Sequence, residues 1–349
     1  MSGSTTRSLL SNNKIIFFLF VEFFFIKLIN RNLLIVSTEM QKIVVIGGGT
    51  GSYTVLRGLK KYSVELTAVI NMMDSGGSAG RLRDEFGFLP AGDVRRGLIA
   101  LSPETSMLRK LFEYRFSKGQ GLEGHSFGNL FLTALRDITG NDANAIEEAG
   151  HILNIKGRVL PVTTTDSHVG AILENGQVIV SEVNLVSPKH DSKLRIKKVF
   201  LVPKAKAYKP AIDSILKADK VVIGPGGLHY SLLPSILVSG IVAALKKTKA
   251  NKIYVCNIMT KAGDATGFKA SDYAAAMEKY LGKGVIDYVI CNNKRPSEKL
   301  LKEYEKEKAE YVEPDLKNHR FKVIKTDLLD NIHLARHNPD KLAKAIMSI

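Results

Sequence analysis

Cysteine is nearly missing from this chain. Among 349 residues there are only two, Cys256 and Cys291, and each lies in an apolar, strand-like run. Two such thiols exclude a disulfide framework and a cysteine metal site, so we expect both to be core residues in a reducing compartment. The composition, 45% hydrophobic and 24% charged, is that of an ordinary globular protein. The sequence therefore predicts a cytoplasmic protein with room for one large α/β domain or two modest ones.

An uninterrupted membrane-spanning run is also missing. The apolar segment 15–26 is broken by Glu22 and followed by Lys27 and Arg31, whereas a membrane span needs about 20 apolar residues. No small-residue cleavage site follows at the right distance, and Met40 stands directly before the first expected core strand. We predict that residues 1–39 are a mis-annotated or disordered extension; a membrane anchor is the alternative.

Acidic residues are outnumbered, and the formal net charge is +16. The densest basic segment is 189–209, where Asp191 is the single acidic residue. No RNA- or DNA-binding module accompanies these charges. We therefore rank a solvated basic surface first, attraction of anionic ligands second and specific nucleic-acid recognition last.

The chain is organised around residues 41–85, which contain a strand, a glycine loop, a helix, a strand and a second glycine loop. Residues 42–46 and 65–71 are typical of buried parallel strands, and 52–61 have helical spacing. Glycines between a strand and a helix let the backbone approach a ligand, and the helix N-terminus attracts an anion. A tight turn that only packs the helix on the sheet is the alternative. The first candidate ligand-binding residues are Gly47, Gly48, Gly49, Thr50 and Gly51.

The first loop lacks the sixth glycine of the dinucleotide fingerprint, because Ser52 stands at that position. An NAD oxidoreductase is therefore the weakest hypothesis. Asp74 follows the second strand, and the second glycine loop leads into Arg81 and Arg83. Two such loops at neighbouring strand ends, with arginines beside one, suit a diphosphate. Alternatively, the arginines begin a solvated helix and pair with nearby acidic residues. The candidates here are Asp74, Gly76, Gly77, Ser78 and Arg81.

A third glycine loop follows the expected strand 220–223 and adds Gly224, Gly226 and Ser231 as candidates. Residues 159–202 instead alternate and turn at Asn175-Gly176, which is a strong hairpin signal. We predict an α/β fold: a doubly wound, mostly parallel Rossmann-like sheet, forming a single domain over 40–349 with a β-hairpin insertion at about 159–202. Ligands of such sheets bind at the carboxyl ends of the strands, so the glycine loops are expected to converge on one cleft.

Several separate motifs resemble one bacterial family. They are IGGGTGS from Ile46, DSGGSAGRLRDE from Asp74, LPAGDVRRGLIAL from Leu89 and GHSFGNL from Gly124. Together they are similar to the gluconeogenesis factor family (YvcK-like), within the CofD-like superfamily of 2-phospho-L-lactate transferases. The resemblance runs from about Met40 to the C-terminus.

The resemblance adds further site residues. Asp93, a helix cap by default, becomes a ligand contact, and Phe268 either stacks on a nucleobase or packs in the core. Arg96 departs from the family asparagine, and the segment GPGGLHYS departs at His229, which we expect to be exposed, and at Tyr230. The site residues implied in this way are Asp93, Arg95, His125, Asn129, Asn257, Thr260 and Phe268. The nucleophile pattern G-x-S-x-G is not met around Ser126, so no catalytic residue is assigned.

The resemblance implies a regulatory protein that binds a nucleotide sugar of the UDP-N-acetylglucosamine type and is needed for cell shape and cell-wall synthesis on gluconeogenic carbon sources. Implied partners are a UDP-sugar or another diphosphate nucleotide and cell-wall synthesis proteins; a homo-oligomer stays open. The alternative is an enzyme that moves a phospholactyl group from a guanosine diphosphate derivative to a deazaflavin. Only this alternative calls for magnesium, and Ser75 replaces one of the aspartates that both branches tend to show. No other cofactor is expected.

Overall fold

The structure is a computed structural model that describes residues 40–186, 191, 193–317, 319–330 and 334–349. The predicted extension, residues 1–39, lies outside the described residues, and so does Lys189 at the start of the basic segment. The described part from Gln41 to Ile349 clusters as one compact unit. No helix within the described ranges is long and apolar enough to cross a membrane.

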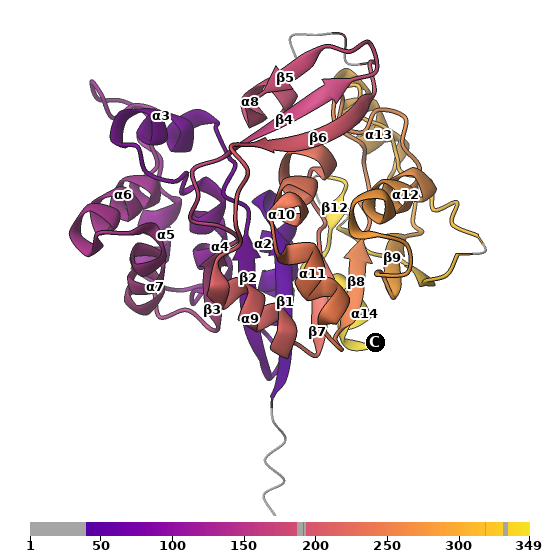
Figure 1. Cartoon of the computed structure of the whole chain (residues 1–349), viewed down its shortest axis with the longest axis horizontal. Coiled ribbons are helices and arrows are strands. Elements are labelled where there is room, and N and C mark those ends of the chain that lie inside the picture. The colour runs from indigo at the N-terminus through magenta and orange to yellow at the C-terminus, as the bar shows by residue number, and fades with distance from the viewer. Residues whose placement is uncertain (1–39, 187–190, 192, 318, 331–333) are drawn as a thin grey trace, which may run out of the picture. The chain divides into compact units, whose positions relative to one another are not determined.

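Seven parallel strands form the central sheet, in the order β10-β9-β8-β7-β1-β2-β3 (Figure 1). The inner strands are short apolar runs because helices cover both faces of the sheet. The strand order reverses beside β1, which pairs with β2 on one side and β7 on the other. The predicted doubly wound, mostly parallel fold is confirmed. The strands are β1 (Gln41–Gly47), β2 (Val64–Ile70), β3 (Arg158–Pro161), β7 (Lys220–Ile223), β8 (Asn251–Val255), β9 (Tyr288–Asn292) and β10 (Lys322–Thr326).

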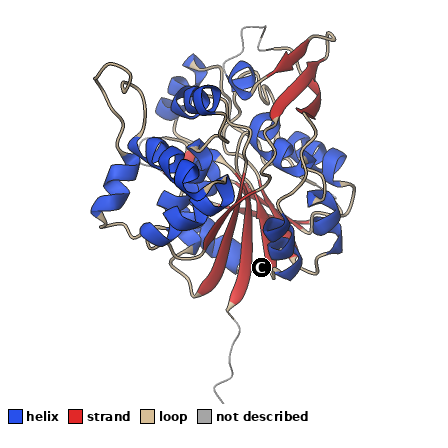
Figure 2. Ribbon diagram, turned by 60° about the vertical axis from the view of Figure 1, so that its left-hand side comes forward, coloured by secondary structure: helices blue, strands red, loops and turns tan. Residues whose placement is uncertain are grey.

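Helices flank the sheet (Figures 1 and 2). α2 packs against both α4 and α14, and α9 packs with α11. In α14, Leu342, Ala343 and Ile346 are buried on one helix face, and the Asn338 side chain caps the N-terminus. The helices are α2 (Gly49–Leu59), α3 (Gly77–Phe86), α4 (Gly92–Leu101), α5 (Met107–Glu113), α6 (Phe127–Thr139), α7 (Asp142–Ile152), α8 (Glu182–Val186), α9 (Lys209–Lys217), the π-helical turn η1 (Leu228–Leu232), α10 (Leu233–Leu237), α11 (Ile241–Lys247), α12 (Ala270–Leu281), α13 (Glu298–Lys306) and α14 (Pro339–Met347).

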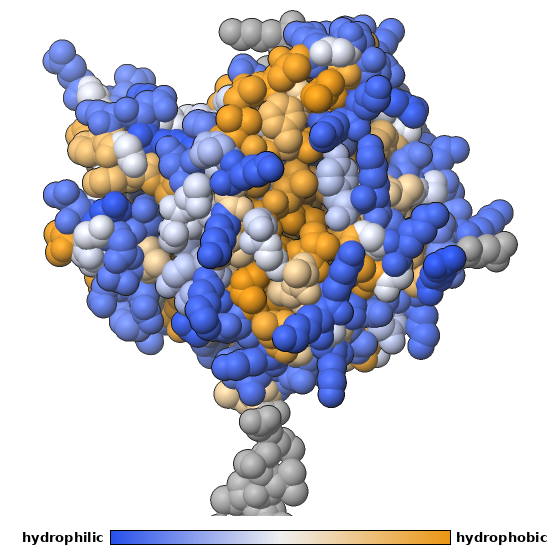
Figure 3. Space-filling view, viewed as in Figure 1, coloured by the Kyte–Doolittle hydropathy of each residue, from blue (hydrophilic) through white to orange (hydrophobic). Residues whose placement is uncertain are grey.

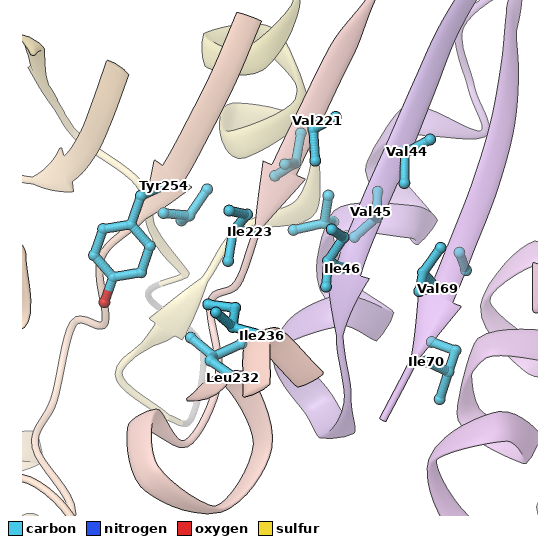
Figure 4. Packing of buried hydrophobic residues seen from close by; sticks show 14 of the residues in the cluster. Val44, Val45, Ile46, Val69, Ile70, Val221, Ile223, Leu232, Ile236 and Tyr254 are labelled. Carbon is cyan, nitrogen blue, oxygen red and sulfur yellow. The ribbon is translucent and has the colours of Figure 1, made fainter. Parts of the chain in front are cut away.

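The core lies beneath the loops that follow β1, β7 and β8 (Figure 4). Ile46, Ile223, Leu232, Ile236 and Tyr254 are all at most 1% exposed. Burial of one large apolar side chain contributes roughly 1.5–3 kcal/mol. The carboxyl ends of these strands, and the loops that leave them, are therefore held on a tightly packed base.

A three-stranded antiparallel sheet is inserted between β3 and β7, in the order β5-β4-β6. It consists of β4 (His168–Leu173), β5 (Val178–Val180) and β6 (Ile196–Val202), and the hairpin turns at Asn175 and Gly176 as predicted. The predicted start of the insertion at residue 159 is wrong, because β3 pairs in parallel with β2 and belongs to the main sheet. The pattern of a short edge strand alone could not tell the two sheets apart.

The inserted sheet is apolar on both faces. Val169, Ala171 and Leu173 point inward and are fully buried, whereas Val178 and Val180 on the outer face are 58% and 44% exposed. Figure 3 shows apolar side chains gathered over this sheet. A short hairpin of β11 (Leu329–Asp330) and β12 (Arg336–His337) completes the described strands.

Candidate functional site

A cleft of about 690 Å³ lies where the loops after β1, β2, β7 and β8 meet. Its volume is within the range of small-ligand sites, roughly 300–1,000 Å³. It sits at the point where the strand order reverses, which is the expected ligand position in an open α/β sheet. The predicted site residues that line it are Gly48, Gly49, Thr50, Gly51, Asp74, Gly76, Gly77, Ser78, Asp93, Arg95, Asn129, Gly226, Ser231 and Asn257.

The three glycine loops thus converge, as predicted, although their contact with a ligand stays a prediction. At two positions of the first loop, close packing within the protein already requires glycine. A Cβ at Gly51 would lie 1.9 Å from the Pro225 carbonyl oxygen, so the first and third loops approach backbone to backbone. A Cβ at Gly48 would lie 2.1 Å from Asp93 Oδ2, so only glycine leaves room for that carboxylate.

Asp93 does not cap its own helix. The N-cap of α4 is Ala91, with no side-chain cap, and Asp93 lies in the first turn with its carboxylate against the N-terminus of α2. Burial first, and then the charge of Asp74, raise the pKa of Asp93 to about 6, while Arg96 and hydrogen bonds from Gly49 and Asn71 oppose the rise. The helix dipole of α2 is thus met by a buried carboxylate that belongs to the protein.

The second loop is attached to the inserted sheet. Asp74 accepts a hydrogen bond from the Gly76 backbone N–H (2.9 Å). The Ser75 hydroxyl lies 2.8 Å from the Ser181 hydroxyl and accepts from the Val183 backbone N–H (3.2 Å). Ser75 therefore fixes the start of α8 over the cleft.

Glu182, in α8, is a cleft residue that the sequence did not reveal. Burial first, and then the charge of Asp74, raise the pKa of Glu182 to about 7; the Ser75 backbone donates to its carboxylate and opposes the rise. No local pattern marked it, because it follows a hairpin more than 100 residues after the loop it faces. Asp74, Asp93 and Glu182 together bring three carboxylates to one cleft.

A buried polar network connects α3, α4 and α6. Ser78 Oγ accepts from the Asn129 amide (3.2 Å) and lies 3.2 Å from His125 Nδ1. Arg95 Nε donates to Asn129 Oδ1 (3.0 Å), and its guanidinium also donates to the Phe112 carbonyl (3.1 Å). Burial, and then the charge of Arg81, lower the pKa of His125, which favours the neutral ring. His125 does not line the cleft and supports Ser78 instead.

Five other predicted site residues lie outside the cleft. Gly47 is the last residue of β1, and Gly224 directly follows β7. Arg81 donates to the Glu123 carbonyl (3.0 Å), and Thr260 Oγ1 accepts from the Glu310 N–H (2.8 Å). Phe268 packs edge-on against Tyr273, with 5.5 Å between ring centroids. For Phe268 the core alternative holds.

Arg83 is also placed differently from the solvated alternative. Its side chain is buried and forms an ion pair with Asp166, with a second bond from the guanidinium to the Ser167 carbonyl (3.1 Å). The partner comes from the segment after β3 and not from the neighbouring Asp84 or Glu85. Arg83 therefore ties α3 to the base of the insertion.

The β7–β8 side of the cleft has no carboxylate among its described lining residues. Asn257 bonds Gly226 twice, accepting from its N–H (3.3 Å) and donating to its carbonyl (3.0 Å). The Tyr230 ring lies beside Gly227, and Lys261 Nζ sits 4.9 Å from its centroid, within cation–π range. Tyr230, not Phe268, is therefore the aromatic residue of this wall.

His229 is 4% exposed, so the expected surface position is wrong. Its Nδ1 lies 3.1 Å from Asp264 Oδ1, and the same carboxylate accepts from the backbone N–H groups of Leu228 and His229 (both 2.9 Å). Asp264 thereby satisfies the start of η1. The exposed reading failed because the partner comes from a loop 35 residues later.

Two buried polar atoms of the cleft have no hydrogen-bond partner within the described residues: Asn71 Oδ1 and Ser231 Oγ. Buried polar groups are normally paired, and an unpaired one costs about 1–3 kcal/mol. A ligand or water that reaches both atoms would remove this cost. Arg336 and His337, from β12, complete the far end of the cleft, and burial lowers the pKa of His337 to about 4.

Magnesium was expected only for the transferase alternative. Across the ranges that the structure describes, no group of three or more histidine, cysteine, aspartate or glutamate side chains is placed to hold a metal ion. Ser75, which stands where the resemblance expects a second aspartate, has its hydroxyl engaged with the insertion. Magnesium binding therefore stays a prediction of the transferase alternative.

Comparisons with known proteins agree with this fold. The family model for the 2-phospho-L-lactate transferase CofD matches residues 43–329. The gluconeogenesis factor of Halalkalibacterium halodurans is 40% identical over 316 residues, covering 88% of this chain and 96% of that protein. The gluconeogenesis factor of Bacillus subtilis is 38% identical over 316 residues, covering 89% of this chain and 98% of that protein. This chain belongs to the gluconeogenesis factor family, within the wider CofD family, and the resemblance is confirmed.

A solved structure and a further sequence relative support the same family. A crystal structure of a UPF0052-family protein from Bacillus halodurans superimposes with a TM-score of 0.85 at 39% identity, covering 89% of this chain and all of that one. The putative gluconeogenesis factor of Thermotoga maritima is 41% identical over 316 residues, covering 88% of this chain and 99% of that protein. The similarity therefore extends over nearly the whole described chain.

Proposed function

We propose that this protein is a cytoplasmic regulatory protein that binds a nucleotide sugar of the UDP-N-acetylglucosamine type in the cleft. In this role it would serve cell shape and cell-wall synthesis during growth on gluconeogenic carbon, with cell-wall synthesis proteins reading the bound state. The observation that carries the proposal is the convergence of three glycine loops, arginines and carboxylates on one cleft of about 690 Å³.

The charges of the cleft suit a ligand with an anionic middle and a hydroxyl-rich end. Arg95, Arg96 and Arg115 supply guanidinium groups, which bind phosphate oxygens well. Gly77 and Ser78, in the first turn of α3, line the same space, and a helix N-terminus favours an anion. Asp74 and Glu182 supply carboxylate oxygens, which accept hydrogen bonds from sugar hydroxyls.

The hydroxyls of the second loop support a binding role. Ser75 is engaged with Ser181 and Val183, and Ser78 with Asn129 and His125. Both hydroxyls therefore hold the protein together, and neither is poised beside a general base that faces the cleft. The geometry is that of a preorganised binding site.

A calorimetric titration with UDP-N-acetylglucosamine, GDP and NAD, each with and without magnesium, tests the proposal. We expect saturable binding of the uridine sugar without a metal requirement and without a product. Magnesium-dependent binding of GDP, with neither other compound bound, would instead favour phospholactyl transfer. Binding of NAD alone would favour an NAD-dependent oxidoreductase.

The cleft itself is tested by substitution. Asp74→Ala removes a carboxylate that accepts a hydrogen bond from the Gly76 backbone N–H, and the fold should persist without this one bond. We expect at least about tenfold weaker binding of the uridine sugar, equivalent to about 1.4 kcal/mol. Glu147→Gln, on the exposed side of α7, is the matched control and should leave binding unchanged.

A further inference from the structure

We infer, on the basis of the proposed function, that Glu182 of the inserted sheet sets the sugar specificity of the cleft. Together with Asp74 and Asp93 it selects nucleotide sugars whose sugar carries no negative charge and rejects sugar acids. The inserted sheet is then part of the ligand site, and its role is to discriminate between ligands that share the same nucleoside diphosphate.

The position of Glu182 follows from the space around Gly76. A Cβ built on Gly76 would lie 3.6 Å from Glu182 Oε2 and 3.5 Å from Asp74 Oδ1. Both carboxylates therefore lie beside the second glycine loop, one from the insertion and one from the end of β2. A group bound over Gly76 meets both.

Glu182 is held there by its neighbours. The Ser75–Ser181 contact (2.8 Å) and the bond from the Val183 N–H to Ser75 Oγ (3.2 Å) bracket Glu182 on both sides along the chain. The Ser75 backbone also donates to the Glu182 carboxylate. Ser181 has a φ of 90°, a left-handed conformation that is unfavourable for serine and that these contacts hold in place.

The cleft also carries positive charge: Arg96 pairs with Asp93 (3.4 Å), and Lys261 lies near Glu182. Arg95 and Arg96 come from α4, and Arg115 from the segment after α5. A diphosphate is drawn to these guanidiniums, which leaves the sugar to face the carboxylates. Sugar hydroxyls can donate to carboxylates, whereas a sugar carboxylate brings a like charge into a partly desolvated site.

Protonation of Glu182 should relax this discrimination. Burial and Asp74 raise the pKa of Glu182 to about 7, so a drop from pH 8 to pH 6 removes much of its negative charge. The charged and titratable groups that face Glu182 from the surrounding elements are Asp74, Asp93, Tyr230 and Lys261. Lys261 opposes the effect, and Asp93, with a pKa raised to about 6, adds to it at the acidic end.

The test uses two ligands that differ only at C6 of the sugar, UDP-glucose and UDP-glucuronate. They are titrated into the full-length protein by calorimetry at pH 8 and pH 6, with UDP-N-acetylglucosamine as the reference. For the unmodified protein at pH 8 we expect UDP-glucuronate to bind at least about tenfold more weakly than UDP-glucose. At pH 6 the ratio of the two dissociation constants should shrink by about threefold or more.

Glu182→Gln keeps an oxygen that can accept from Ser75 but carries no charge. In this variant the ratio at pH 8 should fall by about fivefold or more, and its pH dependence should weaken. Glu147→Gln on α7 makes the same chemical change away from the cleft and should keep the ratio of the unmodified protein. If Glu182→Gln does not fold, the pH series on the unmodified protein still decides.

Equal affinity for UDP-glucose and UDP-glucuronate at pH 8, or a ratio that neither pH nor Glu182→Gln alters, would overturn the inference while leaving the proposed function standing. Absence of binding by UDP-N-acetylglucosamine and by both other sugars would overturn the proposed function, and the inference with it. A ratio that falls with both changes would support Glu182 as the specificity residue.

Discussion

The two sides of the cleft differ in how they treat charge. On the β1–β2 side, burial and then the charge of Asp74 raise the pKa of Asp93, which is 7% exposed. On the β7–β8 side, Asn257 bonds both polar groups of the Gly226 backbone, and no carboxylate among the described residues there lines the cleft. The first side concentrates negative charge, whereas the second has no carboxylate in the described cleft lining and carries the ammonium group of Lys261.

This difference has a consequence for stability. Concentrated buried carboxylates cost folding free energy, and proteins keep such groups at functional sites. Neutral amide bonds to a glycine loop contribute to stability without such a cost. Substitutions on the two sides should therefore act in different directions and with different pH dependence.

The largest expected effect comes from the network that supports the charged side. Arg95→Ala removes bonds to Asn129 and Phe112 and should lower the free energy of unfolding by about 3 kcal/mol. Arg96→Ala removes a neighbouring arginine whose side chain is 46% exposed, and should change stability little. Urea unfolding of both variants checks this; equal losses would show that Arg95 has no special structural role.

On the β7–β8 side, Asn257→Ala should lower the free energy of unfolding by about 1–3 kcal/mol, because two backbone groups of Gly226 lose their partner. The loss should be the same at pH 6 and pH 8, since no titrating group is removed. Thermal unfolding at both values measures it. A loss that varies strongly with pH would contradict the view that Asn257 stabilises the Gly226 loop without help from a titrating group.

Asp93→Asn should have the opposite sign. The folded-state pKa of Asp93 is raised to about 6, so the folded protein holds this proton more tightly than the unfolded chain does. The carboxylate therefore costs stability as the pH rises through its folded-state pKa. The variant should be more stable than the unmodified protein by on the order of 2 kcal/mol at pH 8 and by less at pH 5.

The difference between variant and unmodified protein is the quantity to follow, because buried histidines with lowered pKa, such as His337, act in the opposite direction. Denaturant unfolding at pH 5, 6, 7 and 8 would trace it. An advantage that stays constant over this range would show that the Asp93 carboxylate is not strained by burial and by Asp74.

The smallest effect is expected for Arg81→Ala. Its guanidinium bonds the Glu123 carbonyl and does not line the cleft. Binding of UDP-N-acetylglucosamine should change by less than about twofold, equivalent to about 0.4 kcal/mol. A loss as large as that of Asp74→Ala would mean that Arg81 turns into the site when a ligand is bound.

Features of the fold that depend on local sequence patterns were predicted correctly. Apolar runs and glycine loops, such as 42–51, gave the parallel strands and the convergence of the loops, because the carboxyl ends of parallel strands share one edge. The Asn175-Gly176 hairpin was predicted for the same local reason. The edge strand β3 was misassigned, since pairing with β2 or with the insertion depends on distant residues.

The misjudged site residues share a cause. Glu182 lines the cleft from the insertion, His229 contacts Asp264, and Phe268 packs against Tyr273. Each outcome depends on a partner outside the immediate chain segment, and no spacing rule carries that information. The family resemblance implied a ligand contact for Asp93, but its contact with the α2 N-terminus became visible only in the fold.

The central claim is that the cleft binds a nucleotide sugar. Its most direct test is a calorimetric titration of UDP-N-acetylglucosamine into the unmodified protein and into Asp74→Ala, both first shown to unfold at similar temperatures. The account predicts saturable binding by the unmodified protein and at least about tenfold weaker binding by the variant. Equal binding by both proteins, or binding by neither, would contradict it.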